Sequence, residues 1–552
     1  MDIPSLFMIP SAVSSGKVHS VFPNSTDADF DFNRDSDATR VNSEGLIERV
    51  GYYSAELITN GNFNTDTSSW FGDSNASLTW QTNKSVLVAS TDDATFGIAQ
   101  SNVLTSGKTY RVSFRFKPNN ATTFRVRLGA SGSGQFSTTS FTLNEWNDVD
   151  FVGVANGTTF EIGTLGGSIS NFYLDDVSCK EVTGHRARLN YEIEGGLVNS
   201  KPSLLLEPQS TNLVTYSEDF SHSSYIKVNS TTIVSNEIKA PDNTTTADLI
   251  KAAQTGSIQG VYNNISFTSG QSYAFSVFAK KKENIYLQVQ AGGGTFGTCF
   301  ANFDLENGLV GTVSGGTGQI EAFTNDWYRC IFIVSAISTG TGNISLDLIS
   351  SSTAGRNDNF TGNVGDGLYI WGAMVEQQSY ATSYIPTNGS TQTRAAETCN
   401  GAGTSSIFES SEGILYAEVQ AFSETGSSGV FTLSGGSNTN RVKIELDGGV
   451  VKGRVDVSGS GVGLLNYTVA ITNYLKIALK WKASDFELWV NGSSRASITS
   501  GSSFSANALT ELAFDRGDGG EDFYGKIRDI RVYNTKEMTD SEVDILLTKI
   551  TS

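Results

Sequence analysis

Most of the chain consists of short stretches in which hydrophobic and polar residues alternate with a period of two. In YRVSFRFK, residues 110–117, Val112, Phe114 and Phe116 fall on one face, and charged or small polar residues fall on the other. TFRVRLG at 123–129 alternates in the same way. A strand with one apolar and one polar face is typical of antiparallel sheets that pack face to face. The pattern therefore predicts β-sandwiches.

Four landmarks recur in the same order in two long segments of the chain. They are LITNGNF (57–63) and LVTYSEDF (213–220), TSGKTY (105–110) and TSGQSY (268–273), NEW (144–146) and NDW (325–327), and FYL (172–174) and LYI (368–370). Repetition of this kind indicates a duplicated unit, so we expect one sandwich at 53–182 and a second at 203–380. The spacings differ, as expected if the loops set the choice of ligand.

Residues 404–552 carry a third run of alternating stretches. This run ends in a short helix predicted over 540–549, with Thr539 or Asp540 as its N-cap. The predicted fold class is therefore all-β, with three tandem antiparallel sandwiches of jelly-roll type, an N-terminal arm and a short C-terminal helix.

The segments outside the sandwiches are short. Residues 183–202 and 381–403 are predicted connectors between the sandwiches. Residues 1–52 form an arm that is too small to hold a core of its own. We expect the arm to pack on a later domain, on a neighbouring subunit or on a larger particle.

Composition narrows the classes of function. A chain of 552 residues predicts about three to four domains. Its 38 Lys and Arg against 57 Asp and Glu give a net charge of −19, the opposite sign from a typical nucleic-acid binder. No run reaches the roughly 18 apolar residues of a membrane span, and the start lacks the features of a signal peptide. The four cysteines are predicted to be free thiols.

Catalytic signatures are missing from the sequence. Its three histidines, His19, His185 and His222, stand in the arm and junction segments without a nearby cysteine or serine motif. There is no Walker A loop, no HExxH and no GxSxG elbow. Acidic residues are abundant, so none of them is singled out as a glycosidase pair. We therefore expect no enzymatic activity.

Three phrases resemble a family of bacteriophage virion surface proteins. They are DFDFNRDSDATRVNSEGLIE (29–48), LLLEPQSTNLVTYSEDF (204–220) and ATSYIPTNGSTQTR (381–394). In relatives of this kind the first phrase runs almost directly into the second, so the sandwich at 53–182 is expected to be an insertion. The opening and closing phrases of that sandwich resemble jelly-roll carbohydrate-binding modules. Residues 404–552 resemble concanavalin A-like and laminin-G-like sandwiches.

The resemblance implies a structural protein of a tail or head fibre or appendage. It would be made in the host cytoplasm and displayed on the virion surface, with modules that bind a host-surface polysaccharide during adsorption. Its implied partners are other virion proteins, reached through the arm, and further copies of itself, with a trimer favoured because multiple copies strengthen weak sugar contacts. No nucleic acid or membrane is implied. The alternative is a bacterial surface adhesin or a non-catalytic accessory subunit of a polysaccharide-degrading enzyme; a glycoside hydrolase ranks third.

Candidate sugar contacts are side chains on the face of a strand opposite to its core residues. Aromatic rings stack on pyranose faces, and amides and charged groups bind hydroxyls. These criteria select Phe278, Tyr286, Gln288, Gln290 and Trp489, and a basic stripe suited to an acidic polysaccharide formed by Arg115, Arg125 and Arg127. Packing under a loop, a subunit interface or a merely solvated face would explain the same residues.

Calcium is the one cofactor that the sequence suggests. The resemblance implies a structural Ca²⁺ between the opening loop and the last strand of the first sandwich, with Asn62, Asn64, Asp175 and Asp176 as candidate ligands. A second candidate is the acidic turn with Asp515, Asp518 and Glu521. An acidic turn without a metal would give the same pattern.

Overall fold

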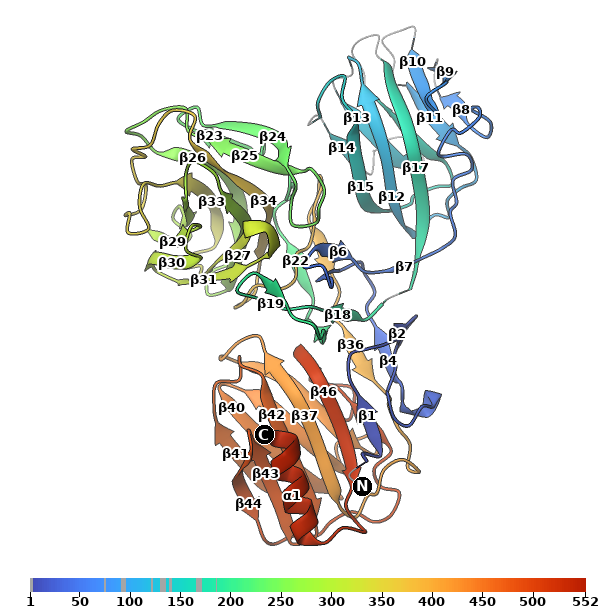
Figure 1. The fold of residues 1–552 in the computed structure, drawn as a ribbon, viewed down its shortest axis with the longest axis vertical. Helices are drawn as coiled ribbons and strands as arrows, with labels where there is room; N and C mark the ends of the chain where they lie inside the picture. Colours follow the sequence, from blue (N-terminus) through green and yellow to red (C-terminus); the bar gives the residue numbers. More distant parts are fainter. Residues whose placement is uncertain are drawn as a thin grey trace.

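The computed structural model describes residues 3–73, 76–90, 96–120, 123–129, 136–138, 141–164, 171–184 and 186–552. His185 lies outside these residues. Within them the chain is built from antiparallel strands and one α-helix, α1 (Asp540–Thr551), which confirms the predicted all-β class. Figure 1 shows three β lobes, with both chain termini in the same lobe. No helix in the described part of the chain is long and apolar enough to cross a membrane.

The first module is the lobe that follows the arm (Figure 1). Its strands are β8 (Phe71–Asp73), β9 (Ala76–Gln81), β10 (Ser85–Ser90), β11 (Phe96–Gln100), β12 (Thr109–Pro118), β13 (Phe124–Leu128), β14 (Phe136–Thr138), β15 (Asn147–Val154), β16 (Phe160–Thr164) and β17 (Asn171–Gly184). They form two sheets in the orders β15-β12-β17-β10-β9 and β14-β13-β16-β11-β8. This strand path is that of a jelly roll with one added edge strand in each sheet.

The second module repeats this path. Its strands are β23 (Tyr225–Val228), β24 (Thr232–Ile238), β25 (Ala247–Lys251), β26 (Gln259–Phe267), β27 (Ser272–Lys281), β28 (Tyr286–Gly292), β29 (Cys299–Asp304), β30 (Leu309–Ser314), β31 (Thr317–Ala322), β32 (Tyr328–Ser335), β33 (Gly340–Leu348) and β34 (Gly367–Glu376). Their orders are β31-β32-β27-β34-β25-β24 and β30-β29-β28-β33-β26-β23. Strands β30 and β31, each at the edge of one of the two sheets, are the main addition relative to the first module.

The repeat extends to individual hydrogen bonds. The hydroxyl of Tyr110 accepts from the amide of Thr105 at 2.8 Å, and the hydroxyl of Tyr273 accepts from the amide of Thr268 at 2.8 Å. Both tyrosines belong to the repeated TSG landmark and are about 1% exposed. A tyrosine buried in a core needs a partner for its hydroxyl, and the same backbone turn supplies it in each module.

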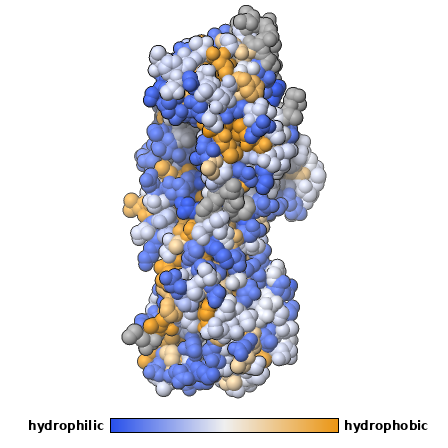
Figure 2. Space-filling view, turned by 90° about the vertical axis from the view of Figure 1, so that its right-hand side faces the viewer, coloured by the Kyte–Doolittle hydropathy of each residue, from blue (hydrophilic) through white to orange (hydrophobic). Residues whose placement is uncertain are grey.

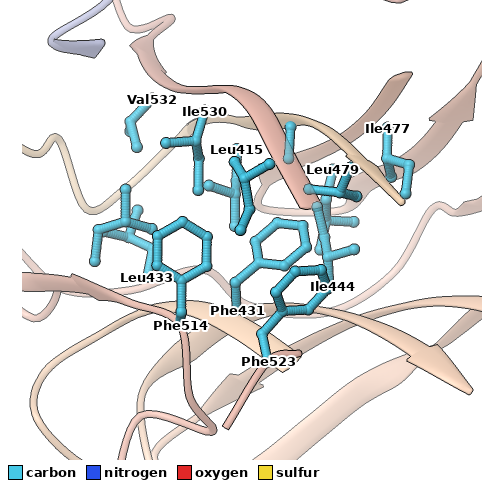
Figure 3. Packing of buried hydrophobic residues seen from close by; sticks show 14 of the residues in the cluster. Leu415, Phe431, Leu433, Ile444, Ile477, Leu479, Phe514, Phe523, Ile530 and Val532 are labelled. Carbon is cyan, nitrogen blue, oxygen red and sulfur yellow. The ribbon is translucent and has the colours of Figure 1, made fainter. Parts of the chain in front are cut away.

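The third lobe packs two antiparallel sheets around the largest core. Its own strands are β37 (Gly413–Ala421), β38 (Ser427–Ser434), β39 (Arg441–Asp447), β40 (Val450–Val457), β41 (Ser460–Thr468), β42 (Leu475–Lys482), β43 (Asp485–Val490), β44 (Ser493–Ile498), β45 (Glu511–Ala513) and β46 (Gly525–Asn534). Side chains from both sheets interdigitate there, among them Leu415, Phe431 and Phe514 (Figure 3).

The arm and the connectors add strands to the third lobe and also contact the other two modules. Their strands are β1 (Leu6–Met8), β2 (Val13–Ser14), β3 (Lys17–Val18), β4 (Phe30–Asn33), β5 (Thr39–Val41), β6 (Ile47–Arg49), β7 (Tyr52–Tyr53), β18 (Arg188–Asn190), β19 (Ile193–Glu194), β20 (Leu197–Val198), β21 (Ser203–Leu206), β22 (Ser210–Asn212), β35 (Gln392–Arg394) and β36 (Thr398–Asn400). Strands β1 and β21 pair with β46, and β4 pairs with β36. The arm therefore packs on a later domain, the first of the three expectations for it.

The leucine run at 204–206 differs from its prediction. The predicted bounds of the second sandwich, 203–380, include this run, which we expected to join the arm to that sandwich. Strand β21 instead lies in the sheet of the third lobe, and Leu204 and Leu206 are fully buried in the core of that lobe. The physical reason is that β46 offers an unpaired edge, and an apolar strand of four residues satisfies it. The second module begins further along the chain, with Val214 and Phe220 in its core.

The final helix begins at Thr539, as predicted, and extends two residues past the predicted end. The Thr539 hydroxyl accepts from the amide of Glu542, and the Glu542 carboxylate accepts from the amide of Thr539 at 2.8 Å, which forms a capping box. The helix buries Val543, Leu546 and Leu547 against the outer face of the β37–β42–β43 region. It therefore shields one outer face of the third lobe.

A buried ionic cluster, the hub, joins the arm, both connectors and the start of the second module. It consists of Arg34, Arg188, Arg394, Glu207 and Glu397, whose side chains are at most 3% exposed. Arg34 Nη1 lies 2.6 Å from Glu397, and Arg188 Nη1 and Arg394 Nη1 lie 2.7 and 3.0 Å from Glu207. Burial opposes ionisation, but Arg394 and Arg188 lower the pKa of Glu207 to about 2. Each of the three family-like phrases supplies a member of the hub.

Candidate functional site

The outer face of the β14–β8 sheet in the first module brings polar side chains from four strands into two rows. The first row runs Phe71, Ala99, Glu161, Arg127, and the second runs Asp73, Gly97, Gly163, Arg125. Paired residues in adjacent strands point to the same side of a sheet, so all of these side chains share one face. We call it the ionic face.

Two arginines and one glutamate hold the centre of the ionic face. Glu161 accepts at 2.9 Å from Arg125 Nη2 through one oxygen and at 2.9 Å from Arg127 Nη1 through the other. Arg127 Nη1 also lies 4.0 Å from Asp73. The side chains of Arg125 and Glu161 are each 6% exposed. The two positive charges are therefore balanced by two carboxylates on the same face.

The central carboxyl of the ionic face is chemically perturbed. Burial raises the pKa of Glu161, a hydrogen bond with Asp73 raises it further, and Arg125 and Arg127 oppose both effects. The Nε–H groups of the two arginines are buried and donate to no described residue. Donors left without an acceptor cost free energy, so a ligand oxygen that reached them would be stabilised.

An exposed aromatic ring stands at one end of the first row. Phe71 is 43% exposed, which is unusual for a phenylalanine in a strand. In the first row, the small Ala99 separates Phe71 from Glu161. The second row has Gly97 and Gly163 at its centre. The ring of Phe71 is therefore open to solvent, whereas the side chains of Arg125 and Glu161 are 6% exposed and that of Arg127 is 15% exposed. An apolar ring beside hydroxyl-binding groups is the combination that a sugar needs.

The second module has a matched face with different chemistry. Its rows run Ile226, Tyr262, Ser345, Gln290, Phe300 and Val228, Gly260, Asp347, Gln288, Asn302. These positions correspond strand by strand to the two rows of the first module, with Gly260 in the place of Gly97. We call this the amide face, because glutamine and asparagine replace the arginines.

The amide face is satisfied from within the chain. Gln288 Nε2 donates to Asn302 Oδ1 at 2.7 Å and to the carbonyl of Gly355 at 2.9 Å. Asn302 Nδ2 donates to the carbonyl of Ala354 at 2.7 Å, so the segment 352–357 lies over this part of the face. Gln288 and Asn302 are fully buried. Their hydrogen-bonding groups are therefore occupied.

A carboxyl lies in the middle of the amide face. Asp347 is 2% exposed and accepts from Ser345 Oγ at 2.7 Å and from the amide of Gln290. Burial raises the pKa of Asp347 to about 7, although the hydrogen bonds from Ser345 and Gln290 oppose the shift. In contrast to Glu161, this carboxyl has no arginine bound to it among the described residues.

The structure corrects part of the predicted sugar site in the second module. Gln288 and Gln290 share a face with Tyr286, as the alternation predicts, but the two glutamines are buried and hydrogen-bonded, so a ligand cannot reach them. Tyr286 stays half-buried at the end of this face. Phe278 lies on the other sheet, 1% exposed, with its ring 5.4 Å from that of Trp371.

Trp489 also requires correction. It points away from the core of the third lobe, as its parity predicts, but α1 covers that face, and Trp489 packs beside the cluster that includes Leu546 and Leu547. A ring under a helix cannot stack on a sugar. The alternation of strand residues identified the face, and only the tertiary packing of α1 shows that the face is covered.

The predicted basic stripe divides between two sheets. Arg115 lies on β12, where it faces Asp148 and Asp176 at 3.6 Å and stacks over Trp146. Arg125 and Arg127 lie on β13 in the other sheet, and their charges are paired with Glu161. No continuous positive stripe forms among these three arginines, so the expected preference for an acidic polysaccharide loses its basis.

The opening loop of the first module lies beside its last strand, as the resemblance implies. The amide of Val177 donates to the carbonyl of Gly61 at 2.9 Å. Asn62 and Asn64 are both exposed. Asp175 accepts from the amide of Asp176, and Asp176 faces Arg115. In the described ranges, no three His, Cys, Asp or Glu side chains gather as a metal site.

The acidic turn of the third lobe is closed by an arginine. Arg516 contacts Asp518 at 3.0 Å and Glu521 at 2.7 Å, and Asp515 accepts from the amide of Gly517 at 2.6 Å. The guanidinium occupies the position between carboxylates that a cation would take. This turn therefore corresponds to the alternative without a metal.

The sequence did not single out Phe71, Asp73 or Glu161. Phe71 and Asp73 come from a three-residue strand that is too short to show alternation, and Glu161 pairs with arginines 34 and 36 positions away. A charged residue within the apolar stretch FEIG was the one available signal.

Two of the three histidines lie in the described residues. The ring of His222 stacks on that of Tyr216, with 3.6 Å between the ring centroids. His19 belongs to the arm.

Figure 2 shows hydrophobic side chains in separate patches between hydrophilic ones on the face that it presents. All four cysteines are free, as predicted; Cys299 is half-buried and the other three are buried.

Comparison with family models and with curated proteins gave no match. Among solved structures, the chain is similar to a tandem CBM22 pair from Paenibacillus barcinonensis Xyn10C, with 11% identity, a TM-score of 0.22, and coverage of 60% of this chain and 98% of that one. A structure titled "CBM4 structure and function" has 21% identity and a TM-score of 0.19, with coverage of 22% of this chain and 99% of that one. Mouse laminin α1 domains LG4-5 have 10% identity and a TM-score of 0.18, with coverage of 51% of this chain and 88% of that one. Likenesses of this size assign neither a family nor a ligand.

Proposed function

We propose that the chain is a structural protein of a bacteriophage surface and that its first module binds glycans through the ionic face. The observation that carries the binding role is the row in which exposed Phe71 stands two positions from the Glu161–Arg127 pair. Binding without turnover is the role we assign to the sandwiches.

The chemistry of the ionic face favours a neutral saccharide. The Phe71 ring would stack on the apolar face of a pyranose, which contributes on the order of 1 kcal/mol beyond the area buried. Glu161 and Asp73 accept from hydroxyl groups, and the unpaired Nε–H groups of Arg125 and Arg127 donate to hydroxyl or ring oxygens. Because two arginines face two carboxylates, the face has no excess charge to select an ionic sugar.

The second module serves a different role in this proposal. Its amide face is closed by residues 352–357, so it stabilises the module instead of binding a ligand. For the first module we also propose a structural Ca²⁺ that would hold the opening loop against β17. Its ligands would be Asn62, Asn64, Asp175 and Asp176.

The virion role is supported by the three family-like phrases, which meet in the hub. A rigid centre would hold the modules in fixed orientation on a particle, and several copies, with a trimer favoured, would turn weak sugar contacts into strong adsorption. The apolar side chains of the arm are used inside the third lobe, so attachment to other virion proteins falls to its exposed Ile3 and Phe22. A bacterial adhesin or an accessory subunit would use the same ionic face; finding the protein on purified particles excludes both.

The binding proposal is tested on a printed array of neutral and acidic glycans. Wild-type protein should bind neutral polysaccharides, and Phe71→Ala should lose at least fivefold in affinity. Leu143→Ala is the matched control, because Leu143 is another exposed apolar residue (48%) of the same module outside the ionic face. Equal binding by Phe71→Ala and Leu143→Ala would overturn the assignment, as would a preference restricted to acidic glycans.

A further inference from the structure

A serine, a histidine and an aspartate of the arm form a continuous hydrogen-bonded chain. His19 Nε2 lies 2.7 Å from Ser14 Oγ, and His19 Nδ1 lies 2.7 Å from Asp29 Oδ2. Ser14 ends β2, His19 follows β3, and Asp29 directly precedes β4 (Figure 1 labels β2 and β4). This is the order of contacts in which serine hydrolases arrange nucleophile, base and orienting carboxylate.

The partners fix the direction of each hydrogen bond. The side chain of Asp29 is 9% exposed, and its carboxylate can only accept, so His19 Nδ1 carries the proton that bridges them. In the neutral imidazole, Nε2 is then an acceptor, and the hydroxyl of Ser14 must donate to it. The ring is therefore held in the tautomer that can remove a proton from Ser14.

Backbone contacts hold this geometry in place. The amide of Ser20 donates to Asp29 Oδ1 at 2.9 Å, which leaves Oδ2 to face the histidine. The amide of His19 donates to the carbonyl of Ala12 at 3.1 Å, and β2 pairs with β3 through a two-residue turn. Gly16 in that turn has a φ of +68°, a value that glycine adopts without strain. The turn brings Ser14 back over His19.

His19 and Asp29 adjoin an open hollow, and the half-buried Ser14 is hydrogen-bonded to His19. His19 and Asp29 line it together with the polar side chains of Ser11, Asn24, Ser25 and Thr26. The His19 side chain is 38% exposed, so a small molecule in solution can reach it. A purely structural hydrogen-bonded chain has no need of such access.

Donors for a developing negative charge follow the serine in the chain. The amides of Ser15 and Gly16 lie in the hairpin turn and donate to no other described residue. In several serine hydrolases the amide after the nucleophile stabilises the oxyanion. The turn offers the same group here.

We propose that Ser14, His19 and Asp29 hydrolyse carboxylic esters of small acyl groups. Ser14 Oγ bonds to the carbonyl carbon while its proton moves to His19 Nε2, and the carbonyl oxygen takes the electron pair near the Ser15 amide. The C–O bond then breaks, and His19 protonates the departing alcohol. Water attacks the acyl-serine, gives its proton to His19, and releases the acid and Ser14–OH. One ester and one water thus give one acid and one alcohol.

The walls of the hollow indicate the substrate class. Hydroxyl and amide side chains suit a polar alcohol, and the small Ala12 and Val21 leave room for a short acyl group but provide no long apolar channel. An acetyl ester on a hydroxyl-rich molecule has both properties. The three residues lie in the arm, and the last of them, Asp29, precedes Phe71 of the ionic face by more than 40 residues. The proposed ester hydrolysis therefore does not depend on the proposed glycan binding.

The activity is tested on the full chain with p-nitrophenyl acetate and a fluorophosphonate probe. The probe should modify Ser14, located by peptide mapping, and ester hydrolysis should fall at least 100-fold in Ser14→Ala and in His19→Gln. Ser43→Ala is the matched control, since Ser43 is an exposed serine of the arm that does not line the hollow, and this variant should retain activity within threefold.

Two results would overturn the proposal. One is wild-type protein whose Ser14 stays unmodified at probe concentrations that label a known serine esterase. The other is hydrolysis by Ser14→Ala equal to that of Ser43→Ala. The labelling experiment needs no variant, so it decides the question even where a substitution disturbs the fold of the arm.

Discussion

The ionic face and the amide face occupy the same positions of two jelly rolls with the same strand order, yet they offer different chemistry. Arg127, Glu161 and Ala99 of the first module correspond to Gln290, Ser345 and Tyr262 of the second. In the first, charged groups bind each other and an aromatic ring stays exposed; in the second, amides bind the covering segment. A duplicated backbone therefore does not imply a duplicated site.

The difference lies in what completes each hydrogen-bonding network. Side-chain amides both donate and accept, so Gln288 and Asn302 can bond each other and backbone carbonyls. Guanidinium and carboxylate groups satisfy one another in fixed directions, and two Nε–H groups are left over. A network with unused donors suits a binding surface, and a closed network suits a structural one.

The largest expected effect comes from breaking the centre of the ionic face. Glu161→Ala would leave Arg125 and Arg127 without their shared carboxylate, and removing one partner of a buried ion pair costs about 3–5 kcal/mol. Calorimetry of the whole chain should show the transition of the first module at a lower temperature, with the other transitions unchanged. Glu145→Ala, an exposed glutamate in the same module, should leave it in place. An unaltered transition in Glu161→Ala would contradict the ionic account.

The second effect is a pH dependence of the second module. Burial raises the pKa of Asp347 to about 7, so the folded state binds a proton that the unfolded state releases between about pH 4 and 7. Stability is therefore full at low pH and falls as pH rises, by about 1.4 kcal/mol per pH unit between the two pKa values. Burial also raises the pKa of Asp248 to about 7, which adds to the same trend.

Unfolding midpoints between pH 5 and 8 measure this dependence. Asp347→Asn should reduce the slope, because asparagine does not ionise; its one carbonyl oxygen can still accept from Gln290, and its NH2 group can donate to the Ser345 hydroxyl. Asp326→Asn is the matched control, at an exposed aspartate of the same module. An unchanged slope in Asp347→Asn would mean that this carboxyl does not titrate in the expected range.

A smaller effect is expected from opening the amide network. Gln288→Ala removes the donors to Asn302 and Gly355 and leaves these groups buried, at a cost of about 1–3 kcal/mol. Gln319→Ala, at an exposed glutamine on β31, should cost less than about 0.5 kcal/mol. Equal stability of the two variants in denaturant titration would show that the covering segment does not depend on Gln288.

The smallest effect separates the two faces by function. Tyr262→Ala removes the ring of the amide face nearest to exposed Ile226, and we expect its glycan affinity to stay within twofold of wild type, because residues 352–357 close this face. The matched comparison is Phe71→Ala on the same glycan array. A loss in Tyr262→Ala as large as in Phe71→Ala would assign binding to both modules.

Strand alternation predicted much of the fold and only part of the site. It identified which residues share a face in 110–117 and 286–290, because the period of two is local. It did not show which faces are covered: α1 lies over Trp489, and a cluster around Trp371 encloses Phe278. Contacts such as Arg125–Glu161 and the four segments that meet in the hub depend on distant parts of the chain. A single sequence carries no local pattern for such contacts.

The most direct test of the contrast is hydrogen–deuterium exchange of the full chain with and without the neutral glycan that binds best on the array. We expect the ligand to slow exchange in β8, β11, β13 and β16 and to leave β26, β28 and β33 unchanged. Protection of β28 and β33, or binding that protects neither face, would contradict the assignment of the site to the first module.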